Sequence, residues 1–186
     1  MSDTPDEGPW RVVGSELALD VPWMRVRRDH VLMHPASPAV DYYVWEGPDI
    51  STVVPRTPDG DFVLCRQYRH AMGRSLLQFP AGQVDAGESP VEAARRELLE
   101  ETGYAATTVI PLATVAACPT KYTGLHHLFL APDVQRQAEP TPDPSEVITV
   151  EVVSRADLLR SVGTPDFMVA DSVVAALLAL NLDQHG

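Results

Sequence analysis

Three glutamates lie close together in the segment RELLEETGY, residues 96–104. Glu97 and Glu101 are four residues apart, and Glu100 is three residues after Glu97. In a helix these spacings bring the carboxylates onto one side, where repulsion destabilises the helix by about 0.2–0.5 kcal/mol per pair. A divalent cation would offset that repulsion, because hard ions such as Mg²⁺ prefer oxygen ligands. The spacing therefore predicts a metal platform that would let an anionic substrate approach an acidic protein.

A run of acidic residues is more often a solvated surface than a site, but the residues around this run follow a stricter pattern. Gly82 is followed after five residues by Glu88, and Glu88 is followed after seven residues by the segment 96–104. This order resembles the Nudix box at every fixed position, with Tyr104 in place of the usual aliphatic residue. Such a motif needs a loop that leads into a helix, and the glycine-rich segment before the acids fits that need. On these residues the chain is identified as a member of the Nudix family.

The resemblance implies both a fold and a reaction. Members of the family have an α+β fold in which an α/β/α sandwich surrounds a mixed β-sheet, and they hydrolyse a nucleoside diphosphate linked to another group. By resemblance, Glu97 and Glu101 bind Mg²⁺ together with the backbone carbonyl of Ala81, and Glu100 assists at the metal and in catalysis. Mn²⁺ is the alternative ion, and two or more ions are expected.

Within the family, the chain most resembles the ADP-ribose pyrophosphatases. The segment RQYRHAMGRSLLQFPAGQVDAGE is similar to their approach to the box, and Pro119 follows Tyr104 by fifteen residues, where those enzymes carry a proline. Residues 146–180, which end in an apolar helical pattern, also resemble theirs. The expected reaction is Mg²⁺-dependent hydrolysis of ADP-ribose or a related nucleoside diphosphate sugar to a nucleoside monophosphate and a sugar phosphate.

The same resemblance assigns catalytic roles. Glu88 and Arg96 resemble the pair that ties the loop to the helix. Glu146, next to a proline-rich loop, is the best candidate for the base that positions or deprotonates water, with Glu139 and Asp143 as rivals. A carboxylate at the edge of a strand, with no role in catalysis, is an equally weighted alternative for Glu146.

Substrate contacts are expected from two basic residues and from aromatic side chains. By resemblance Arg69 contacts a phosphate, and Lys121 either meets a phosphate or is simply solvated. Lys121 lies in PTKYTGLHH, where the similar enzymes commonly carry a carboxylate, so other nucleoside diphosphate sugars stay open. Aromatic rings can stack on adenine, and the candidates in the N-terminal strands are Tyr42, Tyr43, Trp45 and Trp23. In this family such strands often exchange between two subunits, so a homodimer is expected; ordinary core packing is the alternative for each ring.

The elements that must hold these residues are indicated by local signals. Ser89 is placed to cap a helix, with Pro90 at the first helical position and Glu92 completing a capping box. Gly103 stands where a left-handed cap ends a helix. Strands are predicted within 10–34 and at 41–47, 51–55, 61–68, 108–117, 126–131 and 146–153. Loops are predicted at 69–82 and 139–145, and helices after Ser154 and near the C-terminus through Val169, Val173, Leu177 and Leu180.

Composition limits the other functions. With 186 residues and a net charge of −12, the chain fits one domain with a small appendage and should not bind nucleic acid through its overall field. We expect a flexible tail over 1–9, an N-terminal β-strand region over 10–48 and a Nudix hydrolase domain over 49–186. No apolar run predicts a membrane span. The acidic start and two cysteines without metal-site spacing favour the cytoplasm. Hydrolysis of other nucleoside di- or polyphosphates, or a non-catalytic nucleotide sensor, are the alternatives.

Overall fold

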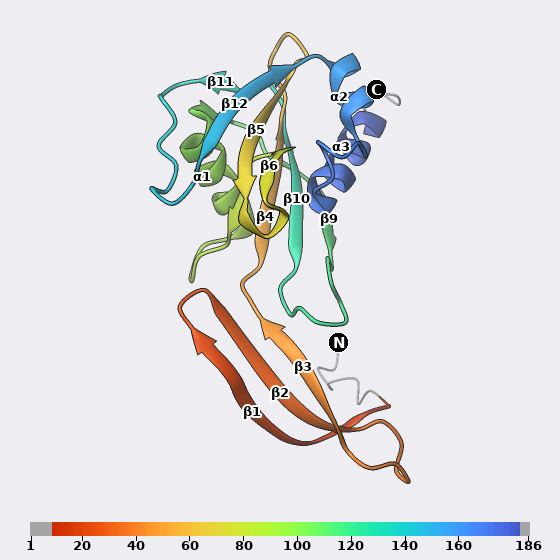
Figure 1. The fold of residues 1–186 in the computed structure, drawn as a ribbon. Coiled ribbons are helices and arrows are strands. Elements are labelled where there is room, and N and C mark those ends of the chain that lie inside the picture. Colours follow the sequence, from red (N-terminus) through yellow and green to blue (C-terminus); the bar gives the residue numbers. More distant parts are fainter. Residues whose placement is uncertain (1–8, 183–186) are drawn as a thin grey trace. The chain divides into compact units, whose positions relative to one another are not determined.

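The computed structural model describes residues 9–182, and these residues fall into two compact units (Figure 1). The described part of Met1–Gly47, together with Cys118–Gly124, forms the first unit; Pro48–Ala117 and the described part of Leu125–Gly186 form the second. The tail predicted over 1–9 lies outside the described residues except for its last position. None of the helices within the described chain has the length and apolarity needed to cross a membrane.

The first unit is an antiparallel sheet with the strand order β1-β2-β3. Its strands are β1 (Arg11–Val21), β2 (Met24–Leu32) and β3 (Val40–Glu46). The prediction of one strand within 10–34 was wrong, because two strands, β1 and β2, form a hairpin there. Two register shifts interrupt the β1–β2 pairing, so the alternation of side chains along β1 is broken. Residues of the 118–124 loop bond to β3, with Lys121 O accepting from Trp45 N at 2.6 Å and Trp45 O accepting from Thr123 N at 3.1 Å.

The second unit contains two larger sheets, with strand orders β7-β4-β10-β9 and β12-β5-β6, and a small pair, β11-β8. The pairing of β4 with β10 is parallel and the other pairings are antiparallel, so the arrangement is mixed. The strands are β4 (Ile50–Pro55), β5 (Phe62–Arg69), β6 (Arg74–Gln78), β7 (Ala81–Gln83), β8 (Tyr104–Ala105), β9 (Ile110–Val115), β10 (His126–Ala131), β11 (Gln135–Arg136) and β12 (Ile148–Val153). The helices are η1 (His70–Met72), α1 (Pro90–Thr102), α2 (Arg155–Ser161) and α3 (Ala170–Leu182).

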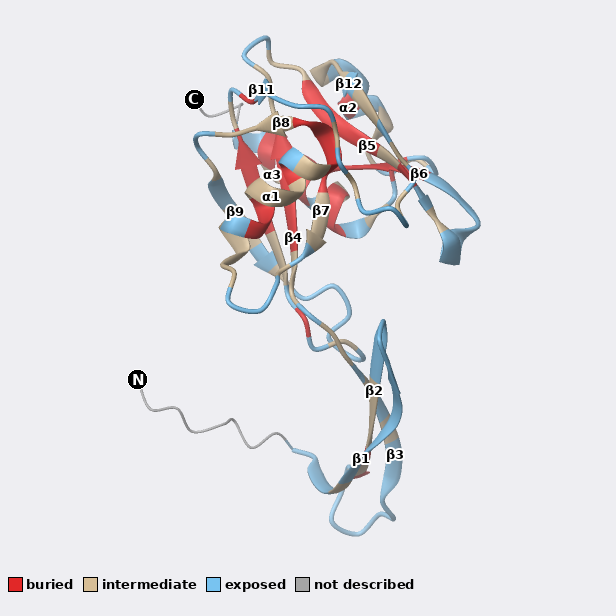
Figure 2. Ribbon diagram, turned by 90° about the vertical axis from the view of Figure 1, so that its left-hand side faces the viewer, coloured by how far each residue is buried: buried red, intermediate tan, exposed pale blue. Residues whose placement is uncertain are grey.

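The strands of the second unit are covered on both faces. Val53 packs into a cluster that contains Ala94 and Leu98 of α1, while its neighbour Val54 packs into a cluster that contains Ala176 of α3. Successive residues of a strand face opposite ways, so the two clusters lie on opposite sides of β4, with α1 on one side and α3 on the other (Figure 1). Buried residues gather in these strands, whereas β1–β3 are mostly exposed (Figure 2). The predicted α/β/α sandwich with an N-terminal β-strand subdomain is confirmed.

One local prediction in this unit was wrong, and another was right only in part. The segment 69–82 is not a loop throughout, because Arg74–Gln78 form β6, which pairs with β5 after a turn at Gly73 with φ of 64°. The predicted C-terminal helix is α3, and Leu180 is buried as expected, but Leu177 is exposed, and Ala175, Ala176 and Ala179 are buried as well. This helix is apolar nearly all round, so periodicity alone does not select its buried face.

Candidate active site

The helix that carries the acids begins and ends as its sequence predicts. The side chain of Ser89 accepts a hydrogen bond from the backbone of Glu92, and the Glu92 carboxylate accepts one from Ser89 N at 2.8 Å. Pro90 occupies the first turn, and Gly103 ends the helix with φ of 73°, its N–H donating to Leu99 O. These caps fix where α1 starts, and so they fix which side of the helix presents Glu97 and Glu101.

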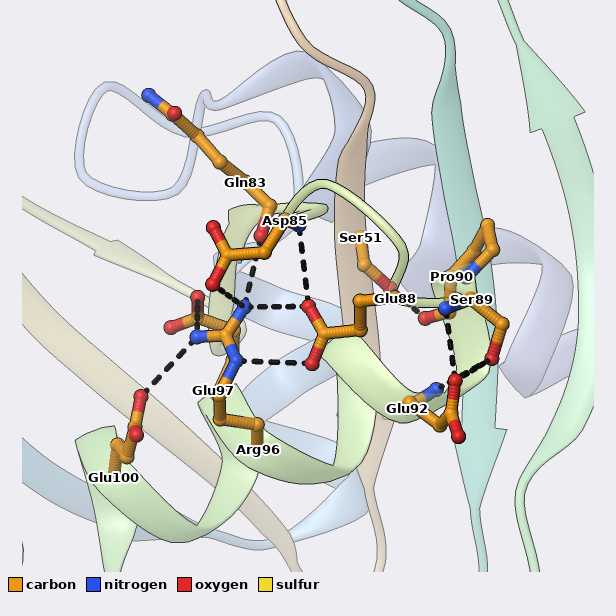
Figure 3. Close-up of polar contacts among 10 residues, drawn as sticks. All are labelled: Ser51, Gln83, Asp85, Glu88, Ser89, Pro90, Glu92, Arg96, Glu97 and Glu100. Atoms are coloured by element: carbon orange, nitrogen blue, oxygen red, sulfur yellow. Dashed lines mark hydrogen bonds and ion pairs between the residues drawn. The ribbon is translucent and has the colours of Figure 1, made fainter.

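Arg96 joins the preceding loop to the helix (Figure 3). Its Nε and Nη2 each donate to one carboxylate oxygen of Glu88 at 3.0 Å, and Nη2 also donates to Gln83 O at 2.9 Å. The remaining nitrogen, Nη1, donates to Glu97 at 2.6 Å and to Glu100 at 3.2 Å. The Arg96 guanidinium lowers the pKa of Glu88, and hydrogen bonds to Glu88 raise the pKa of Arg96. The structure thus brings the predicted pair together and adds two of the acids to it.

Glu101 is almost fully buried, with 1% of its surface exposed. Its Oε2 accepts a hydrogen bond from Ala81 N at 3.2 Å, while Oε1 is buried with no hydrogen-bond partner among residues 9–182. Burial, and then the charges of Glu97 and Glu146, raise the pKa of Glu101 to about 8. A buried carboxylate oxygen without a donor is costly, and a cation is the partner that would satisfy it.

The backbone of β7 presses against the acidic side of α1. A Cβ atom placed on Gly82 would lie 1.9 Å from Oε1 of Glu97, so no larger residue fits there without moving that carboxylate. Burial raises the pKa of Glu97 as well. Ala81, Glu97 and Glu101 therefore meet at one place, where β7 crosses α1.

The acids do not form a ready-made ligand shell. Within residues 9–182, no group of three or more His, Cys, Asp or Glu side chains is arranged to hold a metal ion. Glu97 and Glu100 turn toward Arg96, and Glu101 turns toward the backbone of Ala81. The chemistry of the donors and the unpaired oxygen of Glu101 fit a hard divalent cation, which would compete with Arg96 for Glu97.

Glu146 lies beside these acids, since its charge contributes to the raised pKa of both Glu97 and Glu101. Its Oε1 accepts a hydrogen bond from Gln67 at 3.0 Å. The two rivals are engaged elsewhere: Glu139 pairs with Arg136 at 2.8 Å, and Asp143 accepts bonds from Ser145. Glu146, and neither of its rivals, is among the largest causes of the raised pKa of Glu97 and Glu101.

Three supporting residues were missed in the sequence. Gln67 and Gln78 are buried polar side chains that bond to each other, and Gln67 also bonds to Glu146. Cys65 is buried near Glu101, and burial and then the Glu101 charge raise the pKa of its thiol. The period of two in CRQYR places Cys65, Gln67 and Arg69 on one face of β5. That alternation could have grouped these residues from the sequence. It does not assign them to the site, because that requires knowing that this face of β5 lies toward α1.

The remaining substrate-contact candidates belong to the first unit, apart from Arg69. Lys121 Nζ lies 4.1 Å from the centre of the Tyr42 ring, and Tyr42 also stacks edge-on with Trp10 and donates to Thr120 O. The ring centres of Trp45 and Tyr122 are 4.6 Å apart. Two other rings are exposed: Tyr43, and Trp23 with 90% of its surface exposed. The structure groups Tyr42 with Lys121, and it leaves Tyr43, Trp45 and Trp23 exposed.

Comparison with known proteins decides the family. A model of the NUDIX domain matches residues 47–171, which include the loop, α1 and all the acids described above. The chain belongs to the Nudix family. It is a Nudix hydrolase, as the spacing from Gly82 to Tyr104 indicates, and the predicted resemblance to ADP-ribose pyrophosphatases is confirmed by its relatives.

This Nudix hydrolase is 30% identical to an ADP-ribose pyrophosphatase of Bacillus subtilis (strain 168), over 69% of this chain and 70% of that protein. It is 34% identical to an ADP-sugar pyrophosphatase of Mus musculus, over 61% of this chain and 56% of that protein. Among solved structures, it matches a crystal structure of an ADP compounds hydrolase with a TM-score of 0.83 and 23% identity, over 95% of this chain and 96% of that one. The structural match supports the fold across nearly the whole chain.

Proposed function

We propose that this Nudix hydrolase cleaves the diphosphate of ADP-ribose or a related nucleoside diphosphate sugar, giving a nucleoside monophosphate and a sugar phosphate. The observation that carries the proposal is the meeting of Glu97, Glu101 and Ala81, with a buried, unpartnered oxygen on Glu101. The names of the relatives support the substrate class: one is an ADP-ribose pyrophosphatase and another an ADP-sugar pyrophosphatase.

Glu97, Glu101 and the carbonyl of Ala81 would hold the divalent cation, with Glu100 assisting. We propose Mg²⁺, with Mn²⁺ as the alternative and two or more ions per site. When bound, such ions polarise phosphoryl oxygens and stabilise developing negative charge. The residues fit this role because they supply only oxygen donors, because Gly82 leaves room for Glu97, and because Glu101 Oε1 has no other partner among residues 9–182.

The side chains around the acids would position the substrate and the water. Phosphoryl transfer depends mainly on positioning and charge stabilisation. Glu146, bonded at one oxygen by Gln67, would accept a proton from the attacking water. Arg69 uses only Nε within the described residues, so its terminal nitrogens can donate to a phosphate. Arg96 and Glu88 keep the loop and the helix in register.

The first unit is the proposed place of dimerisation and of adenine binding. β1 exposes Leu17, Leu19 and Val21, together with nearly all its other residues. A long exposed apolar edge strand is a site for pairing with another chain, and we propose that a second copy covers it. Tyr42, Tyr43, Trp45 and Lys121 are the proposed contacts for the nucleotide, in keeping with the family resemblance. We also propose a cytoplasmic location, which the two unpaired thiols of Cys65 and Cys118 support.

The test is a panel of ADP-ribose, nucleotide sugars, dinucleoside polyphosphates and nucleoside triphosphates, incubated with Mg²⁺ and resolved by product. AMP and ribose 5-phosphate released from ADP-ribose are the expected products. Faster turnover of a triphosphate or dinucleoside polyphosphate would move the substrate to that class. Nucleotide binding without turnover of any compound would make the protein a sensor and overturn the proposal.

A further inference from the structure

Four polar side chains form a continuous chain of hydrogen bonds that ends at Glu146. Arg69 Nε donates to Gln78 Oε1 at 2.9 Å, Gln78 Nε2 donates to Gln67 Oε1 at 3.1 Å, and Gln67 Nε2 donates to Glu146 Oε1 at 3.0 Å. Gln78 is 1% exposed and Gln67 is 3% exposed. Burying amides is unfavourable unless their hydrogen bonds are made, so this arrangement needs all its members.

The residues at the two ends fix the direction of the chain. A guanidinium only donates and an ionised carboxylate only accepts, so Gln78 must turn its oxygen toward Arg69 and Gln67 must turn its nitrogen toward Glu146. A flip of either amide would place two donors or two acceptors face to face. The strand register explains how the glutamines meet: Gln78 pairs with Cys65 across β5 and β6, and Gln67 is the next residue on the same face of β5.

We propose that Gln67 and Gln78 are positioning residues that hold Glu146 for catalysis. Gln67 occupies one oxygen of Glu146, so the second oxygen is left to accept a proton from water. Arg69 is the fixed donor at the other end, and a substrate phosphate bound by its terminal nitrogens would hold the guanidinium that orients the chain. This inference rests on the proposed function, because it assumes that Glu146 is the base.

The sharpest variant is Gln78→Glu, which keeps the size of the side chain and its bond to Arg69. It removes the donor to Gln67, so Gln67 must turn its nitrogen toward position 78 and its oxygen toward the Glu146 carboxylate. We expect kcat for ADP-ribose to fall by about 10- to 100-fold. Losses of this size are usual when an outer-shell residue that orients a group at a metal centre is removed. We expect Mn²⁺ affinity, measured by electron paramagnetic resonance, to stay close to the wild type. The matched control is Gln137→Glu, which adds the same charge at an exposed glutamine.

The same change in a Glu146→Gln background separates positioning from general damage. The amide at 146 can donate to the reversed Gln67, so Gln78→Glu should alter kcat by less than about twofold there, because residues that act as a unit are non-additive. An equal loss of kcat in both backgrounds, or no loss in the first, would overturn the inference. If Gln78→Glu does not fold, Gln78→Met is tested in both backgrounds, and kcat should fall only where Glu146 is present.

The outcomes separate a failure of the positioning role from a failure of the proposed hydrolase activity. A wild-type protein that turns over none of the panel disproves the proposed hydrolase before any variant is made. An active wild type with an equally active Gln78→Glu variant disproves only the positioning role. Side-chain amide resonances of Gln67 and Gln78, identified by their loss in the Gln67→Met and Gln78→Met variants, give a readout without turnover. Both should shift in Glu146→Gln, and unchanged resonances would contradict the chain.

Discussion

Glu101 accepts a hydrogen bond from Ala81 N through one oxygen at 3.2 Å and keeps its other oxygen buried without a partner among residues 9–182. The bond orients the carboxylate, and the unpartnered oxygen makes it unfavourable to ionise. Burial, and then the charges of Glu97 and Glu146, raise the pKa of Glu101 to about 8, although the hydrogen bond from Ala81 lowers it. A cation would remove that penalty, so metal binding at this place would release a proton.

The first prediction concerns the stability of the metal-free protein against pH. The pKa of Glu101 rises from 4.5 to about 8 on folding, so the folded state binds the proton more tightly than the unfolded state. Its contribution to stability is full below about pH 4.5 and is lost as pH rises through 8. The free energy of unfolding, measured by urea denaturation in EDTA, should therefore fall between about pH 5 and pH 8. In Glu101→Gln that fall should largely disappear; an identical fall would contradict the assigned cause.

The second prediction concerns Gly82. Because a Cβ atom there would lie 1.9 Å from Glu97 Oε1, Gly82→Ala should push the Glu97 carboxylate out of place. We expect Mn²⁺ affinity to fall by about tenfold or more, measured by calorimetric titration. Gly14→Ala is the control, since its Cβ would meet only His30 at 3.4 Å. Unchanged Mn²⁺ binding in Gly82→Ala would contradict the proposal that the space at Gly82 is needed for Glu97 to bind the metal.

The third prediction concerns the pair formed by Glu88 and Arg96. Glu88→Gln removes the charge from a two-bond contact, and hydrogen bonds to charged groups are worth about 1.5–3 kcal/mol, so the free energy of unfolding should fall by about that amount. Asp85→Asn is the control, because its contact with Arg96 is 4.0 Å long and Asp85 is 74% exposed; a change within about 0.5 kcal/mol is expected. If urea denaturation showed the same loss of unfolding free energy for both substitutions, the stabilising role assigned to the Glu88–Arg96 contact would be contradicted.

The fourth prediction concerns the exposed side chains of β1. If a second copy covers this strand, the protein should sediment as a dimer, and Leu17→Glu with Leu19→Glu should yield monomers. Charged residues on an edge strand prevent pairing between chains. Leu177→Glu on α3 is a control, because Leu177 is also exposed but lies in the other unit. A monomeric wild type in sedimentation equilibrium would contradict the dimer.

The parts that the sequence predicted well depend on local rules. Ser89, Pro90, Glu92 and Gly103 fix the ends of α1 within a single stretch of chain, and the Glu88–Arg96 contact spans only eight residues. The parts that it missed depend on pairing between distant segments. Gln78 has no meaning as a site residue until β6 is known to pair with β5. Residues 118–124 likewise group with the N-terminal strands, whereas the predicted domain boundaries had placed them within 49–186.

The most direct test of the account compares the wild type and Glu101→Gln with ADP-ribose and Mg²⁺, with circular dichroism to check the fold. We predict that the wild type releases AMP. Glu101→Gln should keep the same fold but lose at least about 100-fold in kcat, since even residues that only orient metal ligands are worth 10- to 100-fold. Near-normal activity in Glu101→Gln would contradict the metal platform and, with it, the proposed mechanism.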